Sequence, residues 1–177
     1  MNILEAIYQR RSIRKYQEKK VGRETLVELV KAGAAAPSAM NRQPWHFIII
    51  DDPQDMDGLR KIMKFGRYNA PAAIIVCGNM KKTMPAIARD FWIEDCSAAM
   101  ENILNAALHF GLGTVWLGAY PVGVIIKALS GYLGLPKHLV PLGVAYVGYP
   151  AEEHKPRTQY IDDIVSFGRI KNKSNQL

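Results

Sequence analysis

Arg10-Arg11-Ser12-Ile13-Arg14-Lys15-Tyr16 is the stretch around which the rest of this chain is best interpreted. Three guanidinium groups and one hydroxyl group lie within its first five residues. A planar guanidinium donates two parallel hydrogen bonds to phosphate oxygens, and a serine hydroxyl adds another donor. Arginines this close repel one another unless they share an anion. The stretch therefore indicates either an anion-binding site or, as for many basic clusters, a solvated turn.

The residues before this stretch predict a short helix that leads into it. Asn2 can cap the helix, with Glu5 three residues later in the capping-box position. Its apolar residues fall on one face: Ile3, Leu4, Ile7 and Tyr8. The helix is expected to end near Arg10, and the C-terminal end of a helix favours cations. Residues 1–23 hold seven basic residues against two acidic ones, so much of the net charge of +7 arises there.

A second stretch, Pro37-Ser38-Ala39-Met40-Asn41-Arg42-Gln43-Pro44-Trp45, is polar and bracketed by prolines, which predicts a loop of restricted shape. Asn41 and Gln43 each offer amide donors and a carbonyl acceptor. A heteroaromatic ring with alternating donors and acceptors, such as the pyrimidine edge of a flavin, needs such groups. The alternative is a turn whose amides bond to its own backbone.

Hydrophobic periodicity predicts both strands and helices along the chain. The expected strands cover 46–50, 72–77, 114–117 and 139–146, and the expected helices cover 23–36, a segment from 53, 90–110 and 122–133. Gly118 follows the third strand, where a glycine allows the backbone to approach a ligand closely. Lys155 and Arg157 are two residues apart, so in an extended chain both point the same way. They can complete an anion cage begun by Arg10 and Arg14.

Composition limits the class of protein. The chain of 177 residues is long enough for one domain, and it has no run of eighteen apolar residues, so no membrane span is expected. Its start lacks the pattern of a secretory signal. Cys77 and Cys96 lie in apolar patterns, which indicates buried, reduced thiols in a cytoplasmic protein. Two cysteines and four scattered histidines do not predict a metal site.

Four pieces in register over nearly the full length make the chain similar to the flavin-dependent nitroreductase family. They are Arg10 to Arg14, Pro37 to Trp45, the helix with Ala98 and Asn102 that runs into Gly111-Leu112-Gly113-Thr114-Val115-Trp116-Leu117-Gly118, and Lys155-Pro156-Arg157. The resemblance implies an α+β sandwich around a mixed, mostly antiparallel sheet flanked by helices. It also implies a swapped homodimer with two FMN sites at the subunit interface. Residues 1–169 are then expected to be a single FMN-binding domain, and 170–177 a flexible tail.

The resemblance also implies roles for particular residues. Those expected at the ribityl phosphate are Arg10, Ser12, Arg14, Lys155 and Arg157, with Arg11 near the pyrimidine end of the flavin. Those expected to arrive from the other subunit are Pro37, Ser38, Ala39 and Asn41. Leu117 and Gly118 are expected beside the ring, near N5. The segment from Phe65 to Pro71 is compressed relative to larger members, so neither Arg67 nor Asn69 is assigned a flavin contact.

The expected function is an FMN-dependent oxidoreductase that takes a hydride from NADH or NADPH and passes it to a small oxidised acceptor, a nitroaromatic or a quinone. The cofactor carries the chemistry, so no protein acid, base or nucleophile is assigned. Enone reduction, dehalogenation and ring dehydrogenation remain alternatives, because one fold supports many reactions. A non-catalytic flavin-binding protein is another. Nucleic-acid binding is disfavoured, since the sequence has no helix-turn-helix, zinc-finger or RNP-like pattern.

Overall fold

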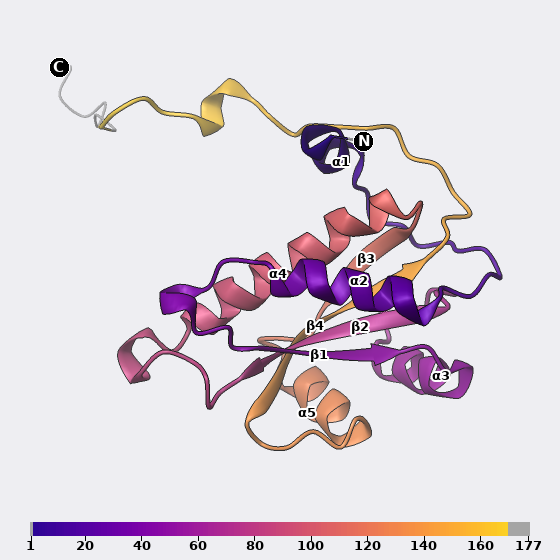
Figure 1. Cartoon of the computed structure of the whole chain (residues 1–177), viewed down its shortest axis with the longest axis horizontal. Helices are drawn as coiled ribbons and strands as arrows, with labels where there is room; N and C mark the ends of the chain where they lie inside the picture. The colour runs from indigo at the N-terminus through magenta and orange to yellow at the C-terminus, as the bar shows by residue number, and fades with distance from the viewer. Residues whose placement is uncertain (1, 170–177) are drawn as a thin grey trace, which may run out of the picture.

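A four-stranded antiparallel sheet in the order β1-β2-β4-β3 forms the centre of the molecule (Figure 1). The computed structural model describes residues 2–169. Its strands are β1 (Trp45–Ile50), β2 (Ala72–Asn79), β3 (Gly113–Gly118) and β4 (Leu139–Gly148). Each predicted strand forms. The parallel element expected of a mixed sheet is, within residues 2–169, an isolated bridge between Ser12 and Thr114.

Helices cover both faces of this sheet (Figure 1). Their bounds are α1 (Ile3–Gln9), α2 (Arg23–Ala34), α3 (Pro53–Ile62), α4 (Phe91–His109) and α5 (Gly123–Tyr132). Side chains alternate between the faces of a strand. Ile74 and Val76 of β2 therefore join the core under α2 and α4, whereas Ile75 joins the core under α3 and α5. The two cores make the molecule an α+β sandwich.

The helix ends follow local sequence signals. Asn2 and Glu5 form the predicted capping box of α1. Asp52 caps α3 through the N–H groups of Gln54 and Asp55, with Pro53 in the first turn. After α4, Gly111 has a φ of +66°, the left-handed conformation that glycine adopts at a helix C-terminus.

The N-terminal helix and the segment after β4 stand outside the two cores. Helix α1 buries Ala6, but Ile3 is 70% exposed and Leu4 is 57% exposed. The segment after β4 leaves the sheet, passes α1 and extends away from the body (Figure 1). We call residues 150–169 the C-terminal arm; it carries exposed Tyr160, Ile161 and Phe167. The tail expected at 170–177 lies outside the described residues. One chain thus leaves considerable apolar surface in water at this end.

Candidate functional site

The early arginine stretch and the C-terminal arm run side by side in opposite directions. The backbone N–H of Ala151 donates to the Lys15 carbonyl at 2.9 Å, and that of Arg157 donates to the Tyr8 carbonyl at 3.1 Å. Between these bonds, Nη1 of Arg11 donates to the carbonyl of Lys155 at 2.7 Å. The structure therefore brings residues 10–14 and 155–157, at opposite ends of the sequence, to one place.

The charges in this region are mostly positive, with one carboxylate at the centre of the backbone contacts. Oε1 of Glu152 accepts from the Arg14 N–H at 2.6 Å and from the Lys15 N–H at 3.3 Å. The Arg14 N–H is the main reason that the pKa of Glu152 lies below its ordinary value. Nη1 of Arg14 donates to the Ser12 carbonyl at 3.3 Å. Nε of Arg10 lies 3.7 Å from Oε1 of Glu101, at the loose end of ion-pair geometry.

The arginine stretch also borders the outer edge of β3. The N–H of Ile13 donates to the Thr114 carbonyl at 2.9 Å, so the backbone of Thr114 faces outward. Because strand residues alternate, the backbone groups of Trp116 and Gly118 face the same outer edge. Odd-numbered residues should then face the neighbouring strand β4, and the Ala119 N–H does so, donating to the Leu142 carbonyl at 2.9 Å. From Thr114 to Gly118 the edge covers four residue steps, or roughly 13 Å.

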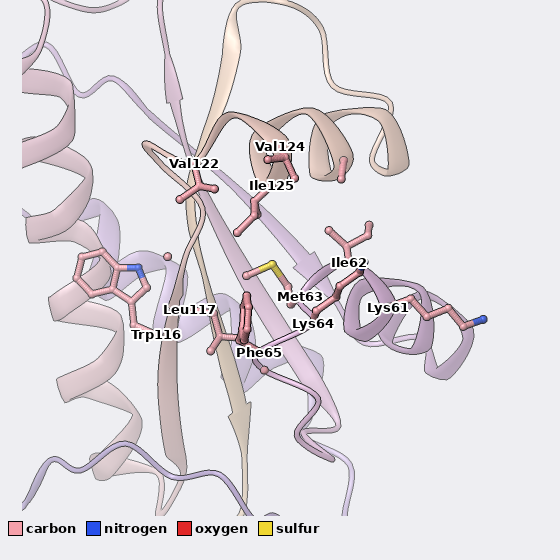
Figure 2. A pocket seen from close by; sticks show the side chains of 13 residues that line it. Lys61, Ile62, Met63, Lys64, Phe65, Trp116, Leu117, Val122, Val124 and Ile125 are labelled. Carbon is pink, nitrogen blue, oxygen red and sulfur yellow. The ribbon is translucent and has the colours of Figure 1, made fainter.

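An apolar cavity of about 650 Å³ opens at the Gly118 end of this edge. Its lining comes from the end of α3 and the following turn, the end of β3, and α5 (Figure 2). Figure 2 shows Met63, Phe65 and Leu117 grouped on one side, with Val122 and Ile125 opposite. Phe65 is 93% exposed at the cavity's mouth. A methyl group added to Gly118 would meet no atom within 4 Å, so the close approach expected at this glycine is to something outside the single chain.

The second predicted piece forms a tight turn with a short 3-10 helix at Ala39–Asn41. Oγ of Ser38 accepts from the Gln43 N–H at 3.0 Å, and Nε2 of Gln43 donates to Oδ1 of Asn41 at 3.1 Å. The guanidinium of Arg42 donates to the carbonyls of Lys82 and Thr83, each at 3.1 Å. The side-chain amides of Asn41 and Gln43 thus bond to each other, whereas the alternative left open by the sequence was a bond to the backbone of the turn. Arg42 has a structural role.

Helix α4 separates this loop from the cavity beside Gly118. The hollow at the loop is lined by Pro37, Ser38 and Ala39 together with Phe91, Glu94, Asp95 and Ala98 of α4. A second hollow, at Gly118, is lined by Ile93 and Ser97 of α4 instead. At 100° per residue these two sets lie on different faces of the helix. Within one chain, the loop does not reach the edge of β3.

Asn69, for which the sequence left a flavin contact unassigned, and two acidic residues that it did not single out, Asp95 and Glu152, have structural roles in this region. The amide of Asn69 pairs with the backbone of Tyr16, donating at 2.7 Å and accepting at 3.0 Å, which gives it a structural role. Asp95, 7% exposed, accepts from the Ala39 N–H at 2.8 Å. In the sequence, Glu152 was marked only by its position shortly before the basic residues Lys155 and Arg157. Residues 2–169 contain no group of three potential metal ligands, and no helix among them is long and apolar enough to cross a bilayer.

Comparison with known proteins identifies the family to which this arrangement belongs. The Nitroreductase family model matches residues 7–66 and 64–149, and the chain belongs to this family of oxidoreductases. A protein of Archaeoglobus fulgidus named "Putative NADH dehydrogenase/NAD(P)H nitroreductase" is 44% identical over 152 residues, covering 85% of this chain and 86% of its own. These matches confirm the predicted family and α+β fold.

Solved structures show the same fold. A Parabacteroides distasonis protein of that same name superposes with a TM-score of 0.88 at 38% identity, covering 96% of this chain and 100% of its own. A Desulfovibrio desulfuricans protein, whose crystal structure is a complex with FMN, superposes with a TM-score of 0.79 at 30% identity, covering 97% of this chain and 99% of its own.

Proposed function

We propose that this protein is an FMN-dependent oxidoreductase that uses NADH or NADPH to reduce a small oxidised acceptor. Bound FMN would supply the redox chemistry, taking up a hydride at N5 and passing it to the acceptor. One observation carries the proposal: a cationic cluster and the open Gly118 end lie along the same outer edge of β3. Family membership and the FMN-bound relative support it. We further propose that residues 1–169 form a single FMN-binding domain.

The chain's own residues divide into a phosphate end and a ring end. Those assigned to the phosphate are Arg10, Ser12, Arg14, Lys155 and Arg157, which come from the two segments that run side by side. Arg11, expected near the pyrimidine end of the flavin, stays assigned to the same FMN site, and its bond to the Lys155 carbonyl helps to hold the arm. Leu117 and Gly118 are assigned to the ring. The outward backbone groups of Trp116 and Gly118 would position it by hydrogen bonding, and glycine leaves room for it.

A second copy of the chain would complete the site. Pro37, Ser38, Ala39 and Asn41 lie on the far side of α4 from Gly118, so we assign them to the cofactor held by a partner subunit. Exposed apolar residues on α1 and on the C-terminal arm are further support, because a monomer rarely leaves such patches uncovered. The proposed assembly is a homodimer with FMN at its interface.

The cavity at Leu117 favours a flat, apolar acceptor such as a quinone or a nitroaromatic. Aliphatic and aromatic side chains from three elements dominate its walls, and such walls bind rings by burial of apolar surface. The exposed Phe65 at its mouth can be covered by a ligand or by the partner. Buried Cys77 and Cys96 are compatible with the reducing cytoplasm, where we place the protein.

The test begins with the purified protein. We expect a yellow protein that releases FMN on denaturation, elutes as a dimer, and oxidises NADH or NADPH when a quinone or nitroaromatic is supplied. A colourless protein that takes up no added FMN would falsify the proposal. FMN binding without oxidation of either nicotinamide would favour a non-catalytic flavin-binding protein, and a screen of enone and halogenated acceptors would detect the other reactions.

A further inference from the structure

The turn at residues 38–43 holds an unusual amount of backbone strain. Met40, Asn41 and Gln43 have φ values of +50°, +52° and +47°, in the left-handed region. Asparagine tolerates this region, but methionine and glutamine adopt it at a cost. Such conformations persist only where the surroundings impose them. Something must therefore hold this turn in place before any ligand reaches it.

The contact at the start of the turn comes from helix α4. Asp95 lies near the first turn of that helix, and its Oδ1 accepts from the Ala39 N–H at 2.8 Å. Its side chain is buried, so the bond is poorly screened by water. A carboxylate acceptor makes a stronger bond to a backbone N–H than a neutral acceptor does. Ala39 is also the first residue of the 3-10 helix that contains Met40 and Asn41, two of the three strained positions.

We propose that Asp95 is a positioning residue of the cofactor site: by holding the Ala39 N–H, it preforms the strained turn that carries Ser38 and Asn41. This inference rests on the proposed function. Preformation matters because a turn ordered only on binding would lose affinity to the entropy of ordering. Asp95 touches neither cofactor nor substrate, and acts through the shape of the turn.

Four variants test this role. Asp95→Ala removes the acceptor, whereas Asp95→Asn keeps a side-chain oxygen in reach of Ala39. Proline at position 39 would remove the donor but would set its Cδ against Oδ1 of Asp95, so it is tested only in the double variant Asp95→Ala/Ala39→Pro, where alanine leaves room for the ring; Ser38 before it is extended at φ −145° and ψ 152°, as a residue before proline should be. Asp90→Asn, a change at an exposed carboxylate that makes no side-chain cap bond to α4, is the matched control. Two quantities are measured: the dissociation constant for FMN, and hydrogen exchange of peptides covering 38–43 in cofactor-free protein.

We expect Asp95→Ala to weaken FMN binding roughly tenfold and to speed exchange at 38–43 by a similar factor. Asp95→Asn should retain most of both, and Asp90→Asn should match the wild type. The double variant Asp95→Ala/Ala39→Pro should bind FMN as Asp95→Ala does, because the N–H that proline removes has already lost its acceptor.

Three results would overturn the role of Asp95: wild-type affinity and exchange in Asp95→Ala, equal losses in Asp95→Ala and Asp95→Asn, or a further loss of affinity in the double variant. If Asp95→Ala fails to fold, hydrogen exchange of the cofactor-free wild type decides: exchange at 38–43 as fast as in an unstructured peptide would show that the turn is not preformed and would refute the inference. A wild-type protein that binds no FMN would instead refute the proposed function, a result distinct from all of these.

Discussion

Replacing Arg14 by alanine is the sharpest test of the proposed phosphate site. The bond that the structure records for its guanidinium within residues 2–169 is a single one, of 3.3 Å to the Ser12 carbonyl, which leaves its other donors available to the proposed anion. One hydrogen bond between charged groups contributes about 1.5–3 kcal/mol. Arg14→Ala should therefore raise the dissociation constant for FMN roughly 10- to 150-fold.

Lys19→Ala is the matched control, because it removes the same unit charge from the same N-terminal segment. Nζ of Lys19 lies 3.9 Å from the centroid of the Tyr149 ring, a cation–π contact outside the proposed cage. Its loss should leave FMN affinity within about twofold, since distant exposed charges are screened at physiological salt. Titration of each protein with FMN, followed by flavin fluorescence, gives both constants. Equal affinities in the two variants would show that Arg14 does not contact the phosphate.

Three further predictions concern the scaffold. Burial raises the pKa of the Cys77 and Cys96 thiols to about 12, so neither should react with a thiol reagent at pH 8 until the protein is denatured, when both should; labelling of the native protein would contradict their burial. A methyl group on Gly143 would come within 2.8 Å of a β3 carbonyl oxygen, so Gly143→Ala should lower the free energy of unfolding by about 1–3 kcal/mol in a urea titration; unchanged stability would mean that the strands separate freely. The lowered pKa of Glu152 means that its stabilising contribution is present above the ordinary value of 4.5 and is lost as pH falls below it. Glu152→Gln should mimic that loss at pH 7 and speed tryptic cleavage after Arg157; unchanged cleavage would show that Glu152 does not hold the arm.

Local signals in the sequence were enough to predict the elements of this fold. The Asn2–Glu5 box forms as predicted, and the Asp52-Pro53 helix start and the glycine after α4 are signals that likewise act over a few residues. The apolar strands were equally clear, because β2 and β4 are buried on both faces. The order of the strands in the sheet could not be predicted in this way. The position of β4 between β2 and β3 depends on contacts between distant segments, and hydrophobic periodicity carries no information about such contacts.

Residue types alone mark the candidate site as separate pieces, and it was the family resemblance that joined them into one expected site. Residue types marked the arginine stretch and the late Lys155-Arg157 pair, and their adjacency follows from backbone bonds that no local pattern encodes. Asp95 looked like one more polar residue of a long amphipathic helix. Its significance comes from burial and from one bond to Ala39, fifty-six positions earlier. A residue that acts through tertiary contact leaves no signature in its own neighbourhood.

The proposed cofactor site would also explain why the arginine stretch and the start of the C-terminal arm meet where they do. The arm after β4 has few apolar contacts with the sheet, and the structure holds it by backbone bonds and by the Glu152 carboxylate. Five cationic side chains gathered from both ends repel one another, so this closure costs electrostatic free energy without an anion. A phosphate bound among these side chains would make the electrostatic free energy of the closed arrangement favourable. Any ligand that binds only the closed arrangement stabilises it by mass action. The same arginines that would bind the cofactor therefore link its affinity to the docking of the C-terminal arm.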